Sequence, residues 1–290
     1  MERRFELTVP HIPGRVRLED YLLNAFPTVS KMYLRELVRD EKCEVNGRNE
    51  NRGFRVRSND LVEIWVDETR GTAMIGEELP LDIVFEDNEL IVINKPSGML
   101  VHPSHREKRG TLLNALAHHL NQIGGDHTRP GLIHRLDKET SGLIVVAKTA
   151  HSHRALSRHF LKKRVQKSYV ALVEGLVAED AGQITAPIGR FPELKHWSVK
   201  DDGKHAESRF VVRERYDDTT MVELEPVTGR TNQLRIHCQS IGHPIVGDTR
   251  RGGREAARLY LHAAKLSFPH QSTNQVLSFE CEAAFPPLMG

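Results

Sequence analysis

The side chains with the clearest chemical potential lie in one short run, residues 131–145, where ionisable groups interrupt apolar sequence. The ionisable residues of this run are His134, Arg135, Asp137, Lys138 and Glu139. Charged groups between core strands cost free energy unless they are paired or used, and the nearby Arg135 favours the ionised form of Asp137. A positioned carboxylate can act as a nucleophile or a base. The same cluster also suits a salt-bridged turn, so the residues alone leave both interpretations open.

The sequence gives little support for metal or nucleotide chemistry. Its 16 histidines are scattered and form no His-Glu-x-x-His pattern. It also contains no Gly-x-x-x-x-Gly-Lys loop for nucleotide phosphates. The three cysteines, Cys43, Cys238 and Cys281, lie far apart in the chain. They indicate neither a disulfide framework nor a thiolate zinc site.

The composition is that of an ordinary soluble protein. The 290 residues suffice for one large and one small domain. Because the net charge is only +2, any nucleic-acid footprint must be a local patch or stripe. The N-terminus leads into no apolar signal segment, and no uncharged apolar run reaches the roughly 18 residues of a membrane span. We therefore expect a cytoplasmic protein that does not contact membranes.

The elements that must position the charged run belong to a region from residue 76 to residue 290. Strands are predicted at residues 83–85, 90–93, 143–147, 169–173, 207–213 and 221–224. Helices are predicted at residues 111–119, 151–163 and 231–241, the last one closed by Gly242. Strands dominate and do not alternate regularly with helices, which favours an α+β fold over a doubly wound parallel sheet. The charged run is then a short turn between two apolar strands.

A smaller unit is predicted upstream, within residues 1–75, because the polar stretch from about Asp67 to Pro80 has no apolar period. Leu18 to Ala25 has helical spacing, and Ser30 is a natural N-cap for a second helix. A strand at 43–45 precedes the hairpin signal Asn46-Gly47, and a last strand runs from 61 to 66. The pattern predicts a compact αα-β unit.

Two predicted helices carry basic ridges with i, i+4, i+8 spacing. The first ridge consists of Lys31, Arg35 and Arg39, and the arginines at 52, 55 and 57 could extend it. The second consists of Arg154, Arg158 and Lys162, followed by three more cations at 163, 164 and 167. Each ridge could be a solvated charged face or a surface that contacts RNA phosphates.

The run Gly131 to Val145 resembles the signature of the large-subunit-type (RluA-type) pseudouridine synthases. Segments 94–102, 167–175, 229–237 and 258–263 resemble further segments of that family. The resemblance implies a mixed, mainly antiparallel sheet, no metal and no organic cofactor. It implies that Asp137 is the catalytic carboxylate, that Tyr169 lies against the flipped base, and that Arg235 pairs with Asp137. It also implies that Arg135 contacts RNA. Arg230, at the entrance of the last predicted helix, could contact a phosphate.

Two positions depart from the family pattern. Asn232 stands where the helix segment commonly has histidine, and the run 247–252 lacks the tyrosine that usually precedes its last glycine. These departures bear on RNA contacts and substrate choice. Residues 13–66 resemble, in turn, the small RNA-binding domain first described in a small-subunit ribosomal protein (ribosomal-S-four-like). This second resemblance implies that the N-terminal unit grips RNA.

The sequence therefore predicts an RNA pseudouridine synthase, with ribosomal RNA of the large subunit as the first expected substrate and transfer RNA as the second. The protein is expected to act as a monomer. A non-catalytic RNA-binding or ribosome-assembly factor is an alternative from another class. A glycoside hydrolase that uses Glu139 as its acid is a more distant one. The target uridine, and whether Asp137 adds to the sugar or removes a sugar proton, stay open.

Overall fold

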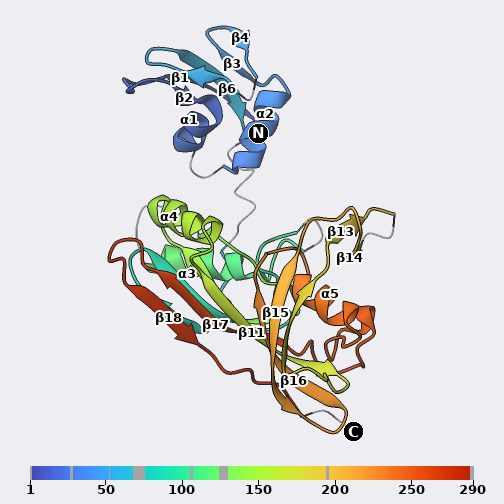
Figure 1. Cartoon of the computed structure of the whole chain (residues 1–290). Coiled ribbons are helices and arrows are strands. Elements are labelled where there is room, and N and C mark those ends of the chain that lie inside the picture. Colours follow the sequence, from blue (N-terminus) through green and yellow to red (C-terminus); the bar gives the residue numbers. More distant parts are fainter. Residues whose placement is uncertain are drawn as a thin grey trace.

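Two units make up the chain, each with its own hydrophobic core (Figure 1). The structure is a computed structural model, and it describes residues 2–26, 29–51, 53–67, 76–104, 107–123, 130–193 and 196–287. One core lies among residues 9–66. The other buried clusters all lie beyond residue 89. The predicted boundary at residue 75 falls beside the segment 68–75, which lies outside the described residues, so the division at that point stays a prediction.

The N-terminal unit consists of two helices against a small antiparallel sheet. Its elements are β1 Arg3–Thr8, β2 Val16–Arg17, α1 Leu18–Ala25, α2 Lys31–Arg39, β3 Cys43–Val45, β4 Arg48–Asn49, β5 Arg55–Val56 and β6 Leu61–Val66. The sheet order is β1-β6-β3-β4, and β2 pairs separately with β5. Ser30 caps α2 as predicted, because its hydroxyl accepts the Tyr33 N–H at 3.1 Å. Asn46 and Gly47 both have positive φ, as the predicted hairpin requires. Strand β1 was not predicted.

A ten-stranded sheet organises the larger unit. Its first elements are β7 Ile83–Glu86, β8 Leu90–Lys95, α3 Leu112–Ile123, β9 Gly131–Leu132, β10 Ser141–Ala147, α4 Ala150–Leu161, β11 Gln166–Glu174 and β12 Ala181–Thr185. The remaining ones are β13 Ile188–Phe191, β14 His196–Val199, β15 Glu207–Arg215, β16 Thr219–Pro226, α5 Gln233–Ser240, the 3-10 turn η1 Thr249–Arg251, β17 Leu261–Pro269 and β18 Val276–Glu280. The main order is β12-β15-β16-β11-β17-β10-β8-β7. Only the β10–β17 pair in this described sheet is parallel. The predicted α+β class, with a mixed and mainly antiparallel sheet, is confirmed.

The central strands β8 and β10 are buried on both faces. Ile144 and Val146 belong to one hydrophobic cluster together with α3, while Leu143 and Val145 belong to a second cluster together with Leu156 of α4. Successive side chains of a strand point to opposite faces, so α3 and α4 cover opposite sides of the sheet. No described helix combines the length and apolar content that a membrane span requires.

The charged run is not the short turn that its sequence predicts. Strand β9 is only two residues long, and its Leu132 pairs with Val146 near the far end of β10. Residues 133–140 therefore form a broad loop beside the sheet, with Asp137 in its middle. Strand β10 follows the loop, and its second residue is Gly142, whose φ is 110° and where a Cβ would collide with the Ala263 backbone on β17. This close approach explains the glycine, because an L side chain would meet both strain and a clash.

Candidate active site

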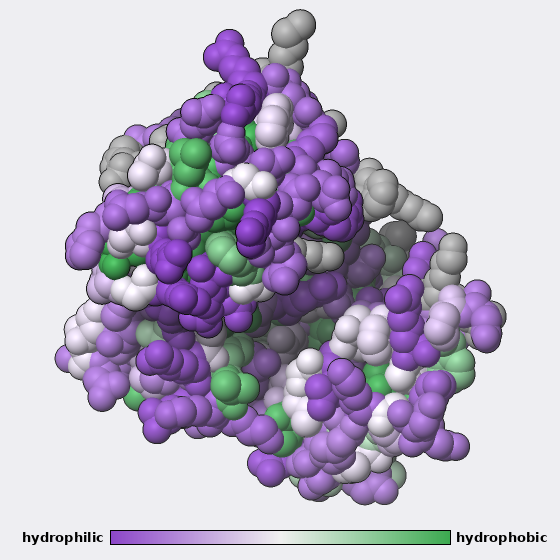
Figure 2. Space-filling view, turned by 90° about the horizontal axis from the view of Figure 1, so that it is seen from above, coloured by the Kyte–Doolittle hydropathy of each residue, from purple (hydrophilic) through white to green (hydrophobic). Residues whose placement is uncertain are grey.

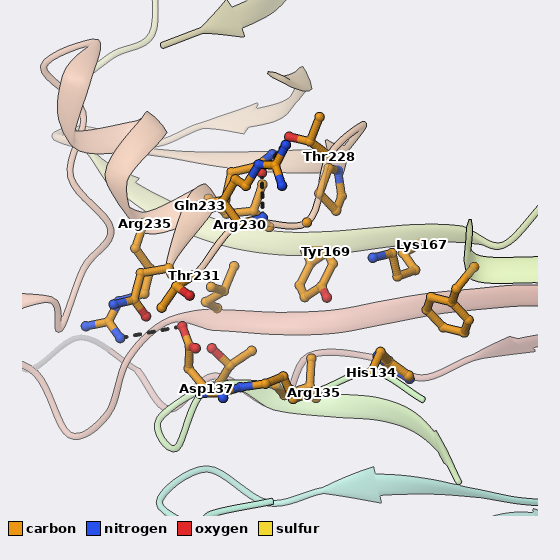
Figure 3. A pocket seen from close by; sticks show the side chains of 18 of the residues that line it. His134, Arg135, Asp137, Lys167, Tyr169, Thr228, Arg230, Thr231, Gln233 and Arg235 are labelled. Carbon is orange, nitrogen blue, oxygen red and sulfur yellow. Dashed lines mark hydrogen bonds and ion pairs between the residues drawn. The ribbon is translucent and has the colours of Figure 1, made fainter. Parts of the chain in front are cut away.

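A cavity of about 350 Å³ lies between the 133–140 loop, strand β11 and the segment that leads into α5 (Figure 3). Its walls include Asp137, Tyr169, Arg235, Arg135 and Arg230. These side chains come from three segments that are far apart in the sequence. The fold thus brings together all three predicted catalytic residues and two of the predicted RNA contacts.

Asp137 is largely buried in the wall of the cavity, with 23% of its side chain exposed. Burial raises the pKa of its carboxyl above the usual value, and the nearby Glu139 adds to the rise. Arg235 and Arg135 pull the pKa in the opposite direction. The arginines thus lower the pKa of Asp137, as predicted, but the loss of hydration on burial raises it by more. The sequence could not show this balance, because the burial comes from residues distant in the chain.

Arg235 lies within ion-pair range of Asp137, but it is held mainly by another carboxylate. Its Nη1 lies 3.8 Å from Oδ2 of Asp137 and 3.5 Å from Glu139. Its Nε and Nη2 donate to the two carboxylate oxygens of Asp248, at 2.7 Å and 2.8 Å. This two-point contact is the stronger geometry. Arg235 is therefore a fixed cation beside Asp137 and not its hydrogen-bond partner.

Tyr169 stands in the middle of the cavity in Figure 3, between Asp137 and Lys167. Strand β11 carries it, and the pairing of β11 with β17 shifts register between Ser168 and Tyr169. Such bulges redirect side chains and often occur beside active sites. The ring is 8% exposed, and burial together with the Asp137 charge raises the pKa of its hydroxyl. The ring therefore stays neutral and offers an aromatic surface to a ligand.

The 94–102 segment packs against the loop that carries Asp137 and holds its backbone by hydrogen bonds. Lys95 is fully buried, and its Nζ donates to the carbonyl oxygens of Lys138 at 3.1 Å and Met99 at 2.9 Å. Burial lowers the pKa of Lys95 to about 8. The Ser97 hydroxyl donates to the Glu139 carbonyl at 2.6 Å. These contacts fix the loop backbone directly after Asp137.

The predicted basic residues divide into two electrostatic classes. Arg154, Arg158 and Lys162 are exposed along α4, and within the described chain they form no ion pair with a carboxylate. Each cation of the α2 ridge instead faces an acid of its own unit. Lys31 pairs with Asp20 at 2.8 Å, Arg35 with Glu19 at 2.9 Å and Arg39 with Asp40 at 2.7 Å.

Two residues of this region were not predicted as functional. Asp248 is 2% exposed and anchors Arg235 from 13 positions downstream; its run, residues 247–252, was noted only for the tyrosine that it lacks. Asn232 was noted only as a departure from the family pattern, yet its side chain lies against the Asp137 carboxylate. Helix α5 also begins at Gln233, two residues later than predicted, because Asn232 adopts left-handed backbone angles.

Metal chemistry has no obvious host within the described ranges. There, no group of three or more His, Cys, Asp or Glu side chains is arranged to hold a metal ion.

His134 is partly buried and its ring stacks on Phe160 at 4.9 Å between centroids. Its Nε2 accepts the Val145 N–H at 3.1 Å, and burial lowers its pKa to about 3. His134 is therefore a neutral structural side chain at neutral pH.

Comparison with known proteins agrees with this geometry. A sequence model described as RNA pseudouridylate synthase matches residues 89–240, a span that contains every lining residue of the cavity except Leu261. The chain belongs to the RNA pseudouridine synthase family. An RNA pseudouridine synthase of Bacillus subtilis, YlyB, is 37% identical over 283 residues, which are 96% of this chain and 93% of that protein.

Other relatives of this pseudouridine synthase carry more specific names. The ribosomal large subunit pseudouridine synthase D of Nitrosomonas europaea is 35% identical over 96% of this chain and 84% of its own length. The protein of the same name from Pseudomonas aeruginosa is 35% identical over 94% and 90%. Among solved structures, human RNA pseudouridylate synthase domain containing 1 matches with a TM-score of 0.62 and 30% identity, over 73% of this chain and 87% of that one. The enzyme is thus an RNA-modifying isomerase of the RluA type.

Proposed function

We propose that this pseudouridine synthase isomerises uridines of large-subunit ribosomal RNA, with Asp137 as its catalytic carboxylate. Two relatives that this chain matches over most of their length are named as large-subunit pseudouridine synthases, which supports this substrate class. The observation that carries the site is a largely buried carboxylate in the wall of a cavity, beside the fixed cation Arg235. Transfer RNA is the second substrate candidate.

In this reaction the protein positions the uridine and supplies charged groups beside it. The bond between N1 of uracil and C1′ of ribose breaks, the detached ring turns, and C5 bonds to C1′. C5 then loses its hydrogen as a proton and N1 gains a proton, so the product is an isomer of uridine. Asp137 assists either by adding to C1′ or by removing a sugar proton. A uridine inside folded RNA must first be extruded. The ring of Tyr169, which lines the cavity, then supports the flipped uracil. Arg135, exposed at the rim, occupies or stabilises the position that the uridine has left in the RNA.

RNA affinity comes from cations on α4 and at the rim of the cavity. Arg154, Arg158 and Lys162 present a ridge on α4 for phosphates, and Arg230 lies at the rim, where its Nε also donates to the His205 carbonyl at 2.9 Å. Phosphate contacts of this kind set affinity and its salt dependence. We assign these contacts the larger share of binding by the catalytic unit.

The N-terminal unit adds a second RNA surface, in keeping with its ribosomal-S-four-like resemblance. Arg17 and Arg55 lie directly opposite each other on β2 and β5. Like charges in this position repel each other unless an anion lies between them. Beside them, a hollow of about 540 Å³ is lined by Arg15, Arg55 and Arg57, and also by Asp60, whose Oδ1 lies 3.5 Å from Nε of Arg57. The α2 ridge contributes less because its cations already face acids, one of which, Glu19, is buried.

The hydrophilic outer surface suits such a partner. Seen from above, where the N-terminal unit lies, the surface in Figure 2 is mostly hydrophilic, with apolar residues only in small patches. We place the enzyme in the cytoplasm with its RNA and expect it to act as a monomer.

The test compares two carboxylates of the same loop. Asp137→Asn should slow tritium release from a transcript labelled at C5 of uridine by at least about a thousandfold, because the reacting carboxylate is lost. Glu139→Gln, a change of the same kind at an exposed position, should keep most of the activity. RNA binding should persist in both variants.

Three results would contradict the proposal. An active Asp137→Asn enzyme would exclude Asp137 as the catalytic group. Wild-type protein that binds ribosomal RNA without releasing tritium would favour the non-catalytic assembly factor. Release of free uracil would favour hydrolysis over isomerisation. Mapping pseudouridines in cells that lack the protein would decide between ribosomal and transfer RNA.

A further inference from the structure

Asn232 has an unusual backbone for a residue at the start of a helix. Its φ is 53° and its ψ is 24°, in the left-handed region that favours glycine. Asparagine tolerates this region better than most residues, but strain there persists only where the surrounding structure holds it. Asparagine is also a good N-cap, yet its side chain caps nothing on α5. Asn232 therefore takes a strained backbone and gives up a cap.

The side chain of Gln233 holds the turn that leads into α5. Gln233 Oε1 accepts the Arg230 N–H at 3.0 Å and the Thr228 hydroxyl at 2.7 Å. The turn before α5 is thus closed without Asn232. The Asn232 amide is free to serve the cavity that this turn lines.

The amide meets the Asp137 carboxylate. We orient it from the donors and acceptors around it, which places the nitrogen toward Asp137. Nδ2 then lies 2.6 Å from Oδ2 and 3.2 Å from Oδ1. The closest approach of Arg235 to the same carboxylate is 3.8 Å, because Asp248 holds its other donors. The hydrogen-bond donor at Asp137 is therefore neutral.

We propose that Asn232 is a positioning residue whose amide fixes the rotamer of Asp137 and stabilises its ionised form. This inference rests on the proposed role of Asp137. The left-handed backbone of Asn232 aims the amide at the carboxylate, while Arg235 supplies charge from a greater distance. A neutral donor favours the anion without adding a further cation to the arginines already near Asp137.

The charged and titratable groups around Asp137 act in both directions. They are Arg235 on α5, Arg135 and Glu139 on the same loop, Arg251 of η1, Lys95 of β8 and Tyr169 of β11. None of them changes when Asn232 is replaced. A hydrogen bond to the anion lowers the pKa of a carboxyl. Its removal should therefore raise the pKa of Asp137 and move the acid limb of the rate to higher pH.

Two variants separate the amide from the backbone. Asn232→Gly removes the amide and accepts the left-handed angles without strain. Asn232→Asp keeps the size of the side chain and its tolerance of these angles but places a second carboxyl against Asp137. The measurement is the single-turnover rate of tritium release from an unmodified large-subunit ribosomal RNA transcript, as a function of pH, together with RNA affinity.

For Asn232→Gly we expect a rate about 10- to 100-fold lower near neutral pH, the usual effect of losing a hydrogen bond to a charged group. RNA affinity should stay within about twofold, and the acid limb should move up by about one pH unit or more. Asn232→Asp should shift the acid limb further in the same direction, because two adjacent carboxyls resist ionising together.

A purely structural role would give another outcome. Variants with the wild-type pH profile, whatever their rate, would overturn the inference. Thermal unfolding identifies a Gly variant that fails to fold, and the Asp variant then provides the test. If Asp137→Asn is inactive while both Asn232 variants behave as wild type, only this inference fails. If Asp137→Asn is active, the proposed function fails with it.

Discussion

At the residue scale, the active site depends on a balance between burial and fixed charge. Burial raises the pKa of Asp137, and two arginines lower it. The shortest of the three ion-pair contacts of Arg235 is made with Asp248, which is itself buried. Asp248 therefore determines where the positive charge beside Asp137 is placed. A carboxylate outside the reaction thus controls the electrostatics within it.

Replacement of Asp248 tests this dependence. Asp248→Ala should lower the free energy of unfolding by about 3–5 kcal/mol, because it leaves a buried guanidinium without its partner. It should also slow tritium release, since Arg235 is no longer held beside Asp137. Chemical denaturation and single-turnover rates measure the two effects. Asp180→Ala is the matched control, because Asp180 forms an exposed pair with Arg215 at 2.8 Å. Its effect should stay below about 1 kcal/mol, and equal losses in both variants would contradict the argument.

At the element scale, short irregular segments define the cavity and regular elements hold them. The β8–β10 pair supports the Asp137 loop, and the bulge in β11 aims Tyr169 into the cavity. Helix α4 packs Leu156 into the core and leaves its basic ridge exposed. Each element thus has one face for stability and another for the substrate.

Removal of charge from α4 should weaken RNA binding through counterions. Arg154→Gln plus Arg158→Gln should lower affinity for a ribosomal RNA transcript. It should also reduce the slope of log affinity against log salt by about 1.4 to 1.8. Binding measured across a salt series tests this expectation. Lys31→Gln plus Arg35→Gln on α2 is the matched comparison, with a smaller change in slope because both cations are already paired. A larger change from the α2 pair would reverse the assignment.

At the scale of the whole molecule, two separate cores predict two folding units. The described buried clusters divide between residues 9–66 and residues 90–268. No described hydrophobic cluster contains residues of both groups. Affinity and chemistry can therefore reside in parts that unfold independently.

Calorimetry of the full chain should show two unfolding transitions. Leu22→Ala, at a fully buried position of the N-terminal core, should lower one transition by about 2–5 kcal/mol. Leu116→Ala, fully buried in the larger core, should lower the other by a similar amount. Each variant serves as the control for the other. If both variants shifted both transitions together, the two units would be a single cooperative domain.

The sequence by itself determined the local structure of this protein and its family. Apolar periods, the Ser30 cap and the Asn46-Gly47 turn predicted the five described α-helices and eight of the eighteen described strands, because these signals act between residues close in the chain. Strands such as β1, β12 and β18 were missed, since pairing with distant strands stabilises them more than their own pattern does. The long run around Asp137 predicted the chemistry through its resemblance to a family.

The tertiary structure alone decided how Asp137 is held. From the sequence, Asp137 was expected to be an anion paired with Arg235. In the fold, burial raises its pKa, Asp248 takes the main contact of Arg235, and the Asn232 amide reaches the carboxylate. These partners lie about 100 residues downstream of Asp137, and the sheet brings them together. Desolvation and hydrogen bonding depend on such contacts, so no pattern of neighbouring residues could show them.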